Sequence, residues 1–150
     1  MNETSTIPVP QGDYRPATRL GTVIYTAGMT PRRDGELIDV GVVGANVDLD
    51  RARVAARQAA ANAVVAAESC LFTGEAIAQV LRMSVFIASA PTFAEHSLVA
   101  DAASEILRKR YGERGLGART AVGVACLPGG APVEVELTAG VRVADGRLPT

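Results

Sequence analysis

Two apolar segments near the end of the sequence carry the charged side chains best suited to chemistry. Arg119 lies near the start of residues 118–124, which are otherwise small and apolar, and Glu134 and Glu136 lie inside residues 133–141. Residues two apart in a β-strand share one face, so the two carboxylates should point the same way. A buried charge without a partner is costly. We interpret Glu136 as one half of a salt bridge at a strand end or subunit interface. For Arg119 and Glu134 the residues alone leave a salt bridge and a binding site both open.

The other reactive side chains do not form a recognisable site. His96 is the single histidine, and Cys70 and Cys126 lack the spacing of a zinc site or a disulfide framework. We expect both cysteines to be reduced, half-buried packing residues. The glycines between residues 112 and 117 lack the spacing and the preceding strand of a dinucleotide-binding loop. We therefore expect no metal ion and no cofactor.

Length and charge narrow the class of protein. A chain of 150 residues fits one domain, which we place at residues 14–143, between a flexible arm (1–13) and a tail (144–150). The 15 basic and 16 acidic residues form no basic stripe, so we expect no nucleic-acid partner. The polar N-terminus resembles no signal peptide, and no apolar stretch is long enough to span a membrane. These features predict a cytoplasmic protein without a membrane partner.

The hydrophobic pattern predicts the element order β-β-α-β-α-β-β. Gly21 suggests a tight turn between the first two strands, and Asp48 and Thr92 are the expected N-caps of the two helices. The alanines of the first helix recur at helical spacing and form a smooth face that can lie close to a sheet, with its arginines and Glu68 facing water. Residues 31–44 are rich in Gly, Pro, Asp and Arg and are expected to form a loop in which 37–40 pair briefly. The expected strands lie within 17–28, 80–88, 118–124 and 133–141, and the expected helices are 49–71 and 93–111.

This order predicts an α+β fold, a mixed β-sheet with two helices on one face. The last strands carry apolar residues on both of their faces, as in Ala121-Val122-Gly123-Val124. The face of the sheet without helices must therefore be buried against another surface. Another copy of the same chain is the simplest cover, and we predict a homotrimer.

Longer stretches of the sequence resemble a known family. The segment 117–128, GARTAVGVACLP, followed by VEVE at 133–136, is similar to the C-terminal signature of the YjgF/Rid (reactive intermediate deaminase) family. The segment 25–28, YTAG, resembles that family's second strand, and Tyr14 lies where the family has an N-terminal tyrosine. The resemblance spans roughly residues 10–141 and implies the trimeric fold of the AroH-type chorismate mutases, which agrees with the element order above.

The resemblance also implies a site. The arginine matching Arg119 binds a carboxylate, and the glutamate matching Glu134 helps to place a water molecule. That water hydrolyses a small imine or enamine acid of the 2-aminoacrylate type to a 2-keto acid and ammonia. Tyr14 would close the pocket between subunits, and Ala27 and Gly28 would contact the substrate. No cofactor is implied, because the C=N bond is already electrophilic.

Departures from the family pattern keep other functions open. A serine common in deaminase members is Ala27 here, a cysteine often found two residues after the arginine is Ala121, and Gly28 is followed by Met29 rather than glutamine. These differences indicate a divergent branch. The second hypothesis is therefore a trimer that binds a small carboxylate metabolite without turning it over. The endoribonuclease activity often attached to the family is a third, against which the near-neutral charge argues, and a chorismate mutase activity would rest on fold analogy alone.

Overall fold

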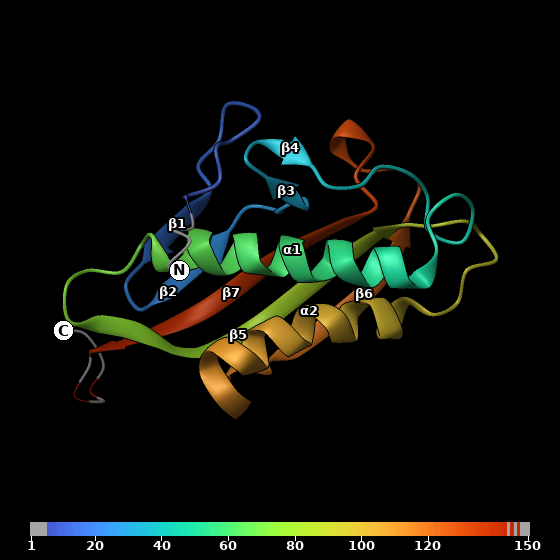
Figure 1. The fold of residues 1–150 in the computed structure, drawn as a ribbon. Coiled ribbons are helices and arrows are strands. Elements are labelled where there is room, and N and C mark those ends of the chain that lie inside the picture. The colour runs from blue at the N-terminus through green and yellow to red at the C-terminus, as the bar shows by residue number, and fades with distance from the viewer. Residues whose placement is uncertain (1–5, 144, 146, 148–150) are drawn as a thin grey trace.

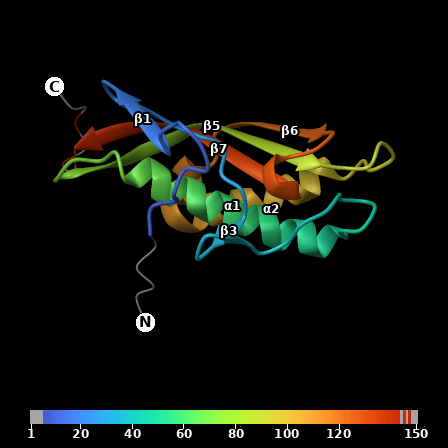
Figure 2. The same cartoon turned by 90° about the horizontal axis from the view of Figure 1, so that it is seen from above.

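The computed structural model describes residues 6–143, 145 and 147. The first five residues of the expected arm and most of the expected tail lie outside this part of the chain. Figure 1 shows one sheet with two helices lying across it, and Figure 2 shows both helices on the same side. The predicted α+β architecture, a mixed sheet covered on one face by two helices, is confirmed.

The sheet has five strands in the spatial order β1-β2-β7-β5-β6. Neighbouring strands are antiparallel except β5 and β6, which are parallel. The last strand of the chain therefore lies in the middle of the sheet, between strands made much earlier. A short hairpin, β3 with β4, stands apart from the sheet. The strands are β1 Ala17–Leu20, β2 Val23–Thr26, β3 Arg32–Arg33, β4 Glu36–Leu37, β5 Glu75–Ala88, β6 Ala118–Val124 and β7 Val133–Val143.

Helix α1, Leu49–Glu68, packs closely because its buried face is nearly all alanine. Asp48 is its N-cap, as predicted, and accepts a hydrogen bond from the backbone N–H of Arg51 at 2.9 Å. Alanine has no side-chain rotamer entropy to lose and a small side chain, so the helix can lie close to the sheet and to α2, His96–Tyr111. The predicted alanine face is fully covered: Ala52, Ala56, Ala59, Ala63 and Ala67 are all at most 1% exposed.

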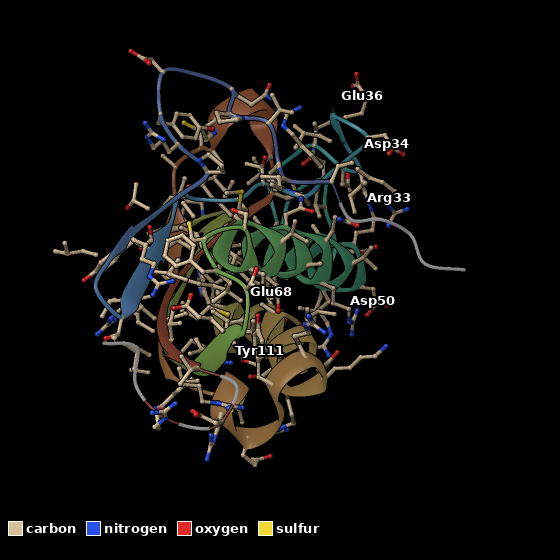
Figure 3. All side chains as sticks on the ribbon, turned by 90° about the vertical axis from the view of Figure 1, so that its left-hand side faces the viewer. Arg33, Asp34, Glu36, Asp50, Glu68 and Tyr111 are labelled. Atoms are coloured by element: carbon tan, nitrogen blue, oxygen red, sulfur yellow. The ribbon has the colours of Figure 1, made fainter. Side chains whose placement is uncertain are left out.

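The charged residues of α1 do more than face water. Arg53 and Arg57 both pair with Glu105 of α2 at 2.9 Å. At the other end of the helix pair, Glu68 accepts hydrogen bonds from Arg110 and from the hydroxyl of Tyr111, also at 2.9 Å. Figure 3 shows Glu68 and Tyr111 lying near one another where the two helices meet. Burial of the Tyr111 ring raises the pKa of its hydroxyl, so Tyr111 remains a hydrogen-bond donor.

Four expected boundaries shift, and the first is the end of strand β7 at Val143 instead of residue 141. Helix α2 begins at His96 rather than Phe93, because the N–H of Phe93 closes a turn on the carbonyl of Ala90, and Thr92 lies within that turn instead of capping the helix. Helix α1 ends at Glu68 instead of Leu71. Strand β5 begins at Glu75 instead of residue 80, because β7 pairs with it over its whole length, from Glu75 with Val143 onward. Long-range pairing decided this last boundary.

The face of the sheet turned away from the helices is open in this chain (Figure 2). Along β7 the residues that alternate with the buried valines, among them Glu134 and Glu136, lie on this open face. Exposed apolar side chains flank them, with Tyr25, Leu81 and Val122 at 52%, 41% and 40% exposure. None of the helices in the described residues has the length and apolar character that crossing a membrane requires.

Candidate functional site

An irregularity between β2 and β7 brings two of the predicted site residues together. Tyr25 is paired with Thr138, and the next pairing is Met29 with Val135, so three residues on one side lie opposite two on the other. The extra residue makes a β-bulge, a feature common beside functional sites. The Leu137 N–H within it is satisfied by the side-chain oxygen of Thr26 at 2.9 Å. The two backbone bonds between Met29 and Val135 then fix the chain on the far side of the bulge.

The bulge presents Gly28 directly to Glu134. A Cβ atom built at Gly28 would lie 2.1 Å from Glu134 Oε1, so only glycine leaves room for the carboxylate. The backbone of Gly28 has no left-handed strain, and the close approach alone explains the glycine. Ala27 precedes it, with its N–H bonded to the Pro16 carbonyl at 2.9 Å and its methyl packed against the core. Ala27 therefore offers no polar side chain beside Glu134.

The carboxylate of Glu134 is half-buried and makes no hydrogen bond to any described residue. Burial raises the pKa of Glu134, and the neighbouring charge of Glu136 raises it further. Both effects favour the protonated carboxyl, which is the behaviour of a group that takes up and returns a proton. The salt bridge expected for Glu136 is absent from the described residues of this single chain, and the charge of Glu136 contributes to the raised pKa of Glu134.

Arg119 lies on β6 at the other side of the sheet, on the face that the helices cover. Its Nη1 donates to Asp101 Oδ1 at 2.7 Å and to Ser104 Oγ at 3.1 Å, both from α2. No described residue accepts from its Nε or Nη2. These two N–H groups form the side of a guanidinium that binds both oxygens of a carboxylate. Asp101 and Ser104 thus bind only Nη1 of the arginine and leave Nε and Nη2 available to a ligand.

A single chain does not bring Arg119 and Glu134 together. Strand β5 separates their strands, and the two side chains lie on opposite faces of the sheet. The sequence identified both residues but not Asp101 or Ser104. The signal available was their three-residue spacing, which places them on one face of α2.

Tyr14 and Gly28 both line a cavity of about 610 Å³. The cavity lies between the N-terminal segment, the β3–β4 hairpin and α1, and its walls include the two neighbouring arginines Arg32 and Arg33. The sequence predicted a loop here with brief pairing at 37–40, whereas the pairs are Arg32 with Leu37 and Arg33 with Glu36, and it missed both arginines as site residues. The available signal was the pair of adjacent arginines before the Asp34-Gly35 turn. Among the described residues there is no cluster of three or more histidine, cysteine, aspartate or glutamate side chains that could hold a metal ion.

The free cysteines are in different surroundings. Cys70 is half-buried, as expected, whereas Cys126 is exposed near the end of the β6 segment. The expectation of a packing role was therefore wrong for Cys126, because the chain leaves the sheet before reaching it.

Comparison with known proteins identifies this arrangement. The family model described as endoribonuclease L-PSP matches residues 4–141. Protein TCP17 of Trypanosoma cruzi is 34% identical over 128 residues, which are 85% of this chain and 80% of that protein.

Solved structures show the same similarity to this chain. One is the structure of Atu1372 from Agrobacterium tumefaciens, which is described as a protein of unknown function. Its sequence is 34% identical, and the match covers 90% of this chain and 87% of the Atu1372 chain with a TM-score of 0.83. The YjgF gene product of E. coli, at 24% identity, shares the fold with a TM-score of 0.64 over 89% of this chain and 91% of its own. The match over nearly the whole chain means that this protein belongs to the endoribonuclease L-PSP family, the family of the YjgF proteins.

Proposed function

We propose that the protein hydrolyses small imine or enamine acids of the 2-aminoacrylate type to 2-keto acids and ammonia. The half-buried carboxylate of Glu134, which has no hydrogen-bond partner among the described residues of its own chain and a raised pKa, is the observation that supports this most directly. A buried carboxylate without a partner is costly, and a reaction that needs a proton acceptor gives a reason for it. Family membership supports the same general function.

Glu134 would act on a water molecule. In the imine form of the substrate, the water oxygen bonds to the C=N carbon while Glu134 takes a proton from the water. The carboxyl returns this proton to the nitrogen, which gives a carbinolamine. Glu134 then takes the proton of the new hydroxyl group and passes it to the amino group, so that the C–N bond breaks, ammonia leaves and the carbonyl of the 2-keto acid forms. An enamine enters this sequence after a proton adds to its terminal carbon. The substrate's C=N bond supplies the electrophile.

Arg119 would bind the substrate carboxylate through its free Nε and Nη2 groups. Since Arg119 and Glu134 lie on opposite faces of one sheet, a complete site requires Arg119 of one subunit and Glu134 of another. A homotrimer that buries the open sheet face and the edge strand β6 is the assembly we propose. Tyr14 would close the site, and Ala27 and Gly28 would contact the substrate through their backbone. We place the protein in the cytoplasm, where its two free cysteines stay reduced.

A second candidate is a trimer that binds a small carboxylate without reaction. The observation favouring it is Ala27, whose methyl packs into the core and leaves no hydroxyl beside Glu134 to help position a water. A third candidate is the endoribonuclease activity after which the family is described, and a Shewanella oneidensis protein of solved structure, 26% identical, is also described as a putative endoribonuclease. The formal net charge of −1 gives that activity little support.

The test is ammonia release from freshly generated 2-aminoacrylate. Wild type should accelerate release, Arg119→Ala and Arg119→Lys should lose most of the acceleration, and Glu134→Gln should lower kcat more than it weakens binding of a 2-keto acid. A loss of about 30-fold or more in kcat/KM for Arg119→Ala corresponds to the roughly 2–5 kcal/mol of a lost charged contact. Arg114→Gln, on an exposed turn, is the control. If wild type binds 2-keto acids but releases no ammonia, the second candidate is favoured. If wild type cleaves RNA and Glu134→Gln does not, the third candidate is favoured.

A further inference from the structure

The cavity beneath the N-terminal segment has features of a ligand site separate from Arg119 and Glu134. Its volume of about 610 Å³ lies within the range of small-molecule pockets. Gly28 forms part of one wall, while the Glu134 side chain is not among the residues that line the cavity. All the residues that line the cavity belong to this one chain.

The charges around the cavity are predominantly cationic. Arg32, Arg33 and Asp34 are the charged residues of its lining. Neither arginine forms an ion pair with a described carboxylate, although Arg19, Arg51 and Arg119 elsewhere all do. The Nε of Arg32 is buried and has no hydrogen-bond partner among the described residues. Figure 3 shows Arg33 and Asp34 close together on the hairpin.

The cationic wall is held in place by a chain of hydrogen bonds. Arg33 Nη2 donates to Gln58 Oε1 at 3.0 Å, and Gln58 Nε2 donates to Asn62 Oδ1, also at 3.0 Å. Asn62 Nδ2 in turn donates to the carbonyls of Thr30 and Arg32 at 3.0 and 2.9 Å. This network fixes the hairpin and the Arg33 side chain against α1, and Arg32 Nη1 donates to the carbonyl of Gly35 at 2.8 Å. Both guanidinium groups are therefore positioned before any ligand arrives.

The remaining wall is apolar. Ile7 and Val9 of the N-terminal segment, Met29, and Val65 of α1 line the cavity beside the arginines. Ile7 and Val9 are 53% and 77% exposed, so this segment has not completed its packing in the free chain. A ligand with an apolar body would give these side chains a surface to cover.

We propose that this cavity binds a small organic carboxylate, with the anionic group on Arg32 and Arg33 and the apolar body against Met29 and Val65. Two guanidinium groups without a carboxylate partner among the described residues favour a carboxylate over a neutral ligand, because each can donate two hydrogen bonds to its oxygens. The apolar wall favours a branched or unsaturated hydrocarbon chain over a fully polar anion. The cavity shares Tyr14 and Gly28 with the proposed deamination site, but its anionic group would bind neither Arg119 nor Glu134.

The probe is 4-methylpentanoate, which has no keto group, and its neutral partner is 4-methylpentanamide. Titration into ¹⁵N-labelled wild type should shift the amide signals of residues 28–35 and 58–65. The amide compound and inorganic phosphate should each bind at least about ten-fold more weakly, since one lacks the charge and the other the apolar body. Equal or tighter binding by either compound would contradict the proposed ligand class.

Variants separate this site from the one containing Arg119. Arg33→Gln, and Arg32→Gln with Arg33→Gln, should weaken binding of 4-methylpentanoate by about ten-fold or more, whereas Arg114→Gln and Arg119→Gln should leave it unchanged. Ala61→Phe, which fills the cavity from α1, should abolish binding even where the arginines remain. Unchanged binding by the double arginine variant, shifts centred on Arg119, or no binding by wild type at millimolar concentration would each overturn the proposal.

Discussion

Gly28 shows how one missing side chain can shape a site. Its backbone lies against Glu134 so closely that a methyl group has no room. We expect Gly28→Ala to push the Glu134 carboxylate out of its half-buried position, at a cost of about 1–3 kcal/mol of stability, typical of overpacking. Any ammonia release should fall together with stability. Urea denaturation of this variant and of Gly140→Ala, where φ is not positive and the added atom would make only ordinary contacts at 3.9 Å or more, is the measurement. Equal losses in both would show that contact with Glu134 is unimportant.

The ionisation of Glu134 gives a second prediction at this scale. Its folded pKa is raised by burial and by Glu136, so the folded protein holds the charged form at a cost. That cost is absent below the ordinary pKa of 4.5, grows as the pH rises from there and is complete above the folded pKa. Glu134→Gln should therefore have a higher melting temperature than wild type at pH 7, and the difference should shrink toward pH 4. A lower melting temperature at pH 7 would mean that the carboxylate has a partner in the assembled protein.

At the scale of elements, one ion pair links edge strand β1 to strand β5, with strands β2 and β7 between them in the sheet. Arg19 of β1 contacts Glu75 at the start of β5, with Nη2 and Oε1 2.9 Å apart, and its guanidinium also lies 4.9 Å from the centre of the Phe72 ring. The hydrogen bond from Arg19, followed by that from the Phe72 N–H, lowers the pKa of Glu75 to about 2. This contact closes the loop between α1 and β5 onto β1.

Glu75→Gln should consequently be less stable than wild type at pH 7. Because the folded pKa is lowered, the stabilisation by Glu75 is present above its ordinary value of 4.5 and is lost as the pH falls toward about 2. The two proteins should approach equal melting temperatures at the acid end of that range. Glu113→Gln, whose carboxylate is 83% exposed, is the matched control and should change little at any pH. A pH-independent difference for Glu75→Gln would assign the effect to packing.

The order of helices and strands followed from local patterns, and the parts that the sequence missed depend on distant contacts. The alanine spacing and the Asp48 cap were sufficient for α1, because both act within a few residues. The start of α2 depended on a turn between Ala90 and Phe93. The bulge at Ala27 and Gly28 depends on the register of β2 against a strand more than 100 residues away.

The same reasoning applies to the site. Arg119 and Glu134 stood out as charges within apolar strands, but their opposite faces and the partners of Arg119 depend on the sheet order. The arginines of the hairpin carried no signal beyond their adjacency, since their lack of carboxylate partners among the described residues appears only in three dimensions.

At the scale of the whole molecule, the open sheet face predicts assembly. Tyr25, Leu81 and Val122 are exposed apolar side chains on strands whose other face is covered by the helices. Strand β6 lies at the edge of the sheet and is largely apolar, and no described strand pairs with its outer side. Natural proteins usually cover such an edge. Light scattering at micromolar concentration should give three times the mass of one chain, and Val122→Asp should lower it. A monomeric wild type would exclude both the trimer and a site shared between subunits.

The central position of β7 has a consequence for how the chain folds during synthesis. Until residues 133–143 have left the ribosome, β2 and β5 each lack the neighbour that later lies between them. The apolar faces of the early strands and of the alanine-rich helix therefore stay partly exposed until β7 is inserted. Such late, long-range pairing slows folding and exposes the nascent chain to aggregation. Chains stalled before Val133 should accordingly remain sensitive to protease and bind chaperones, whereas release of β7 should convert them to the protected fold in one step.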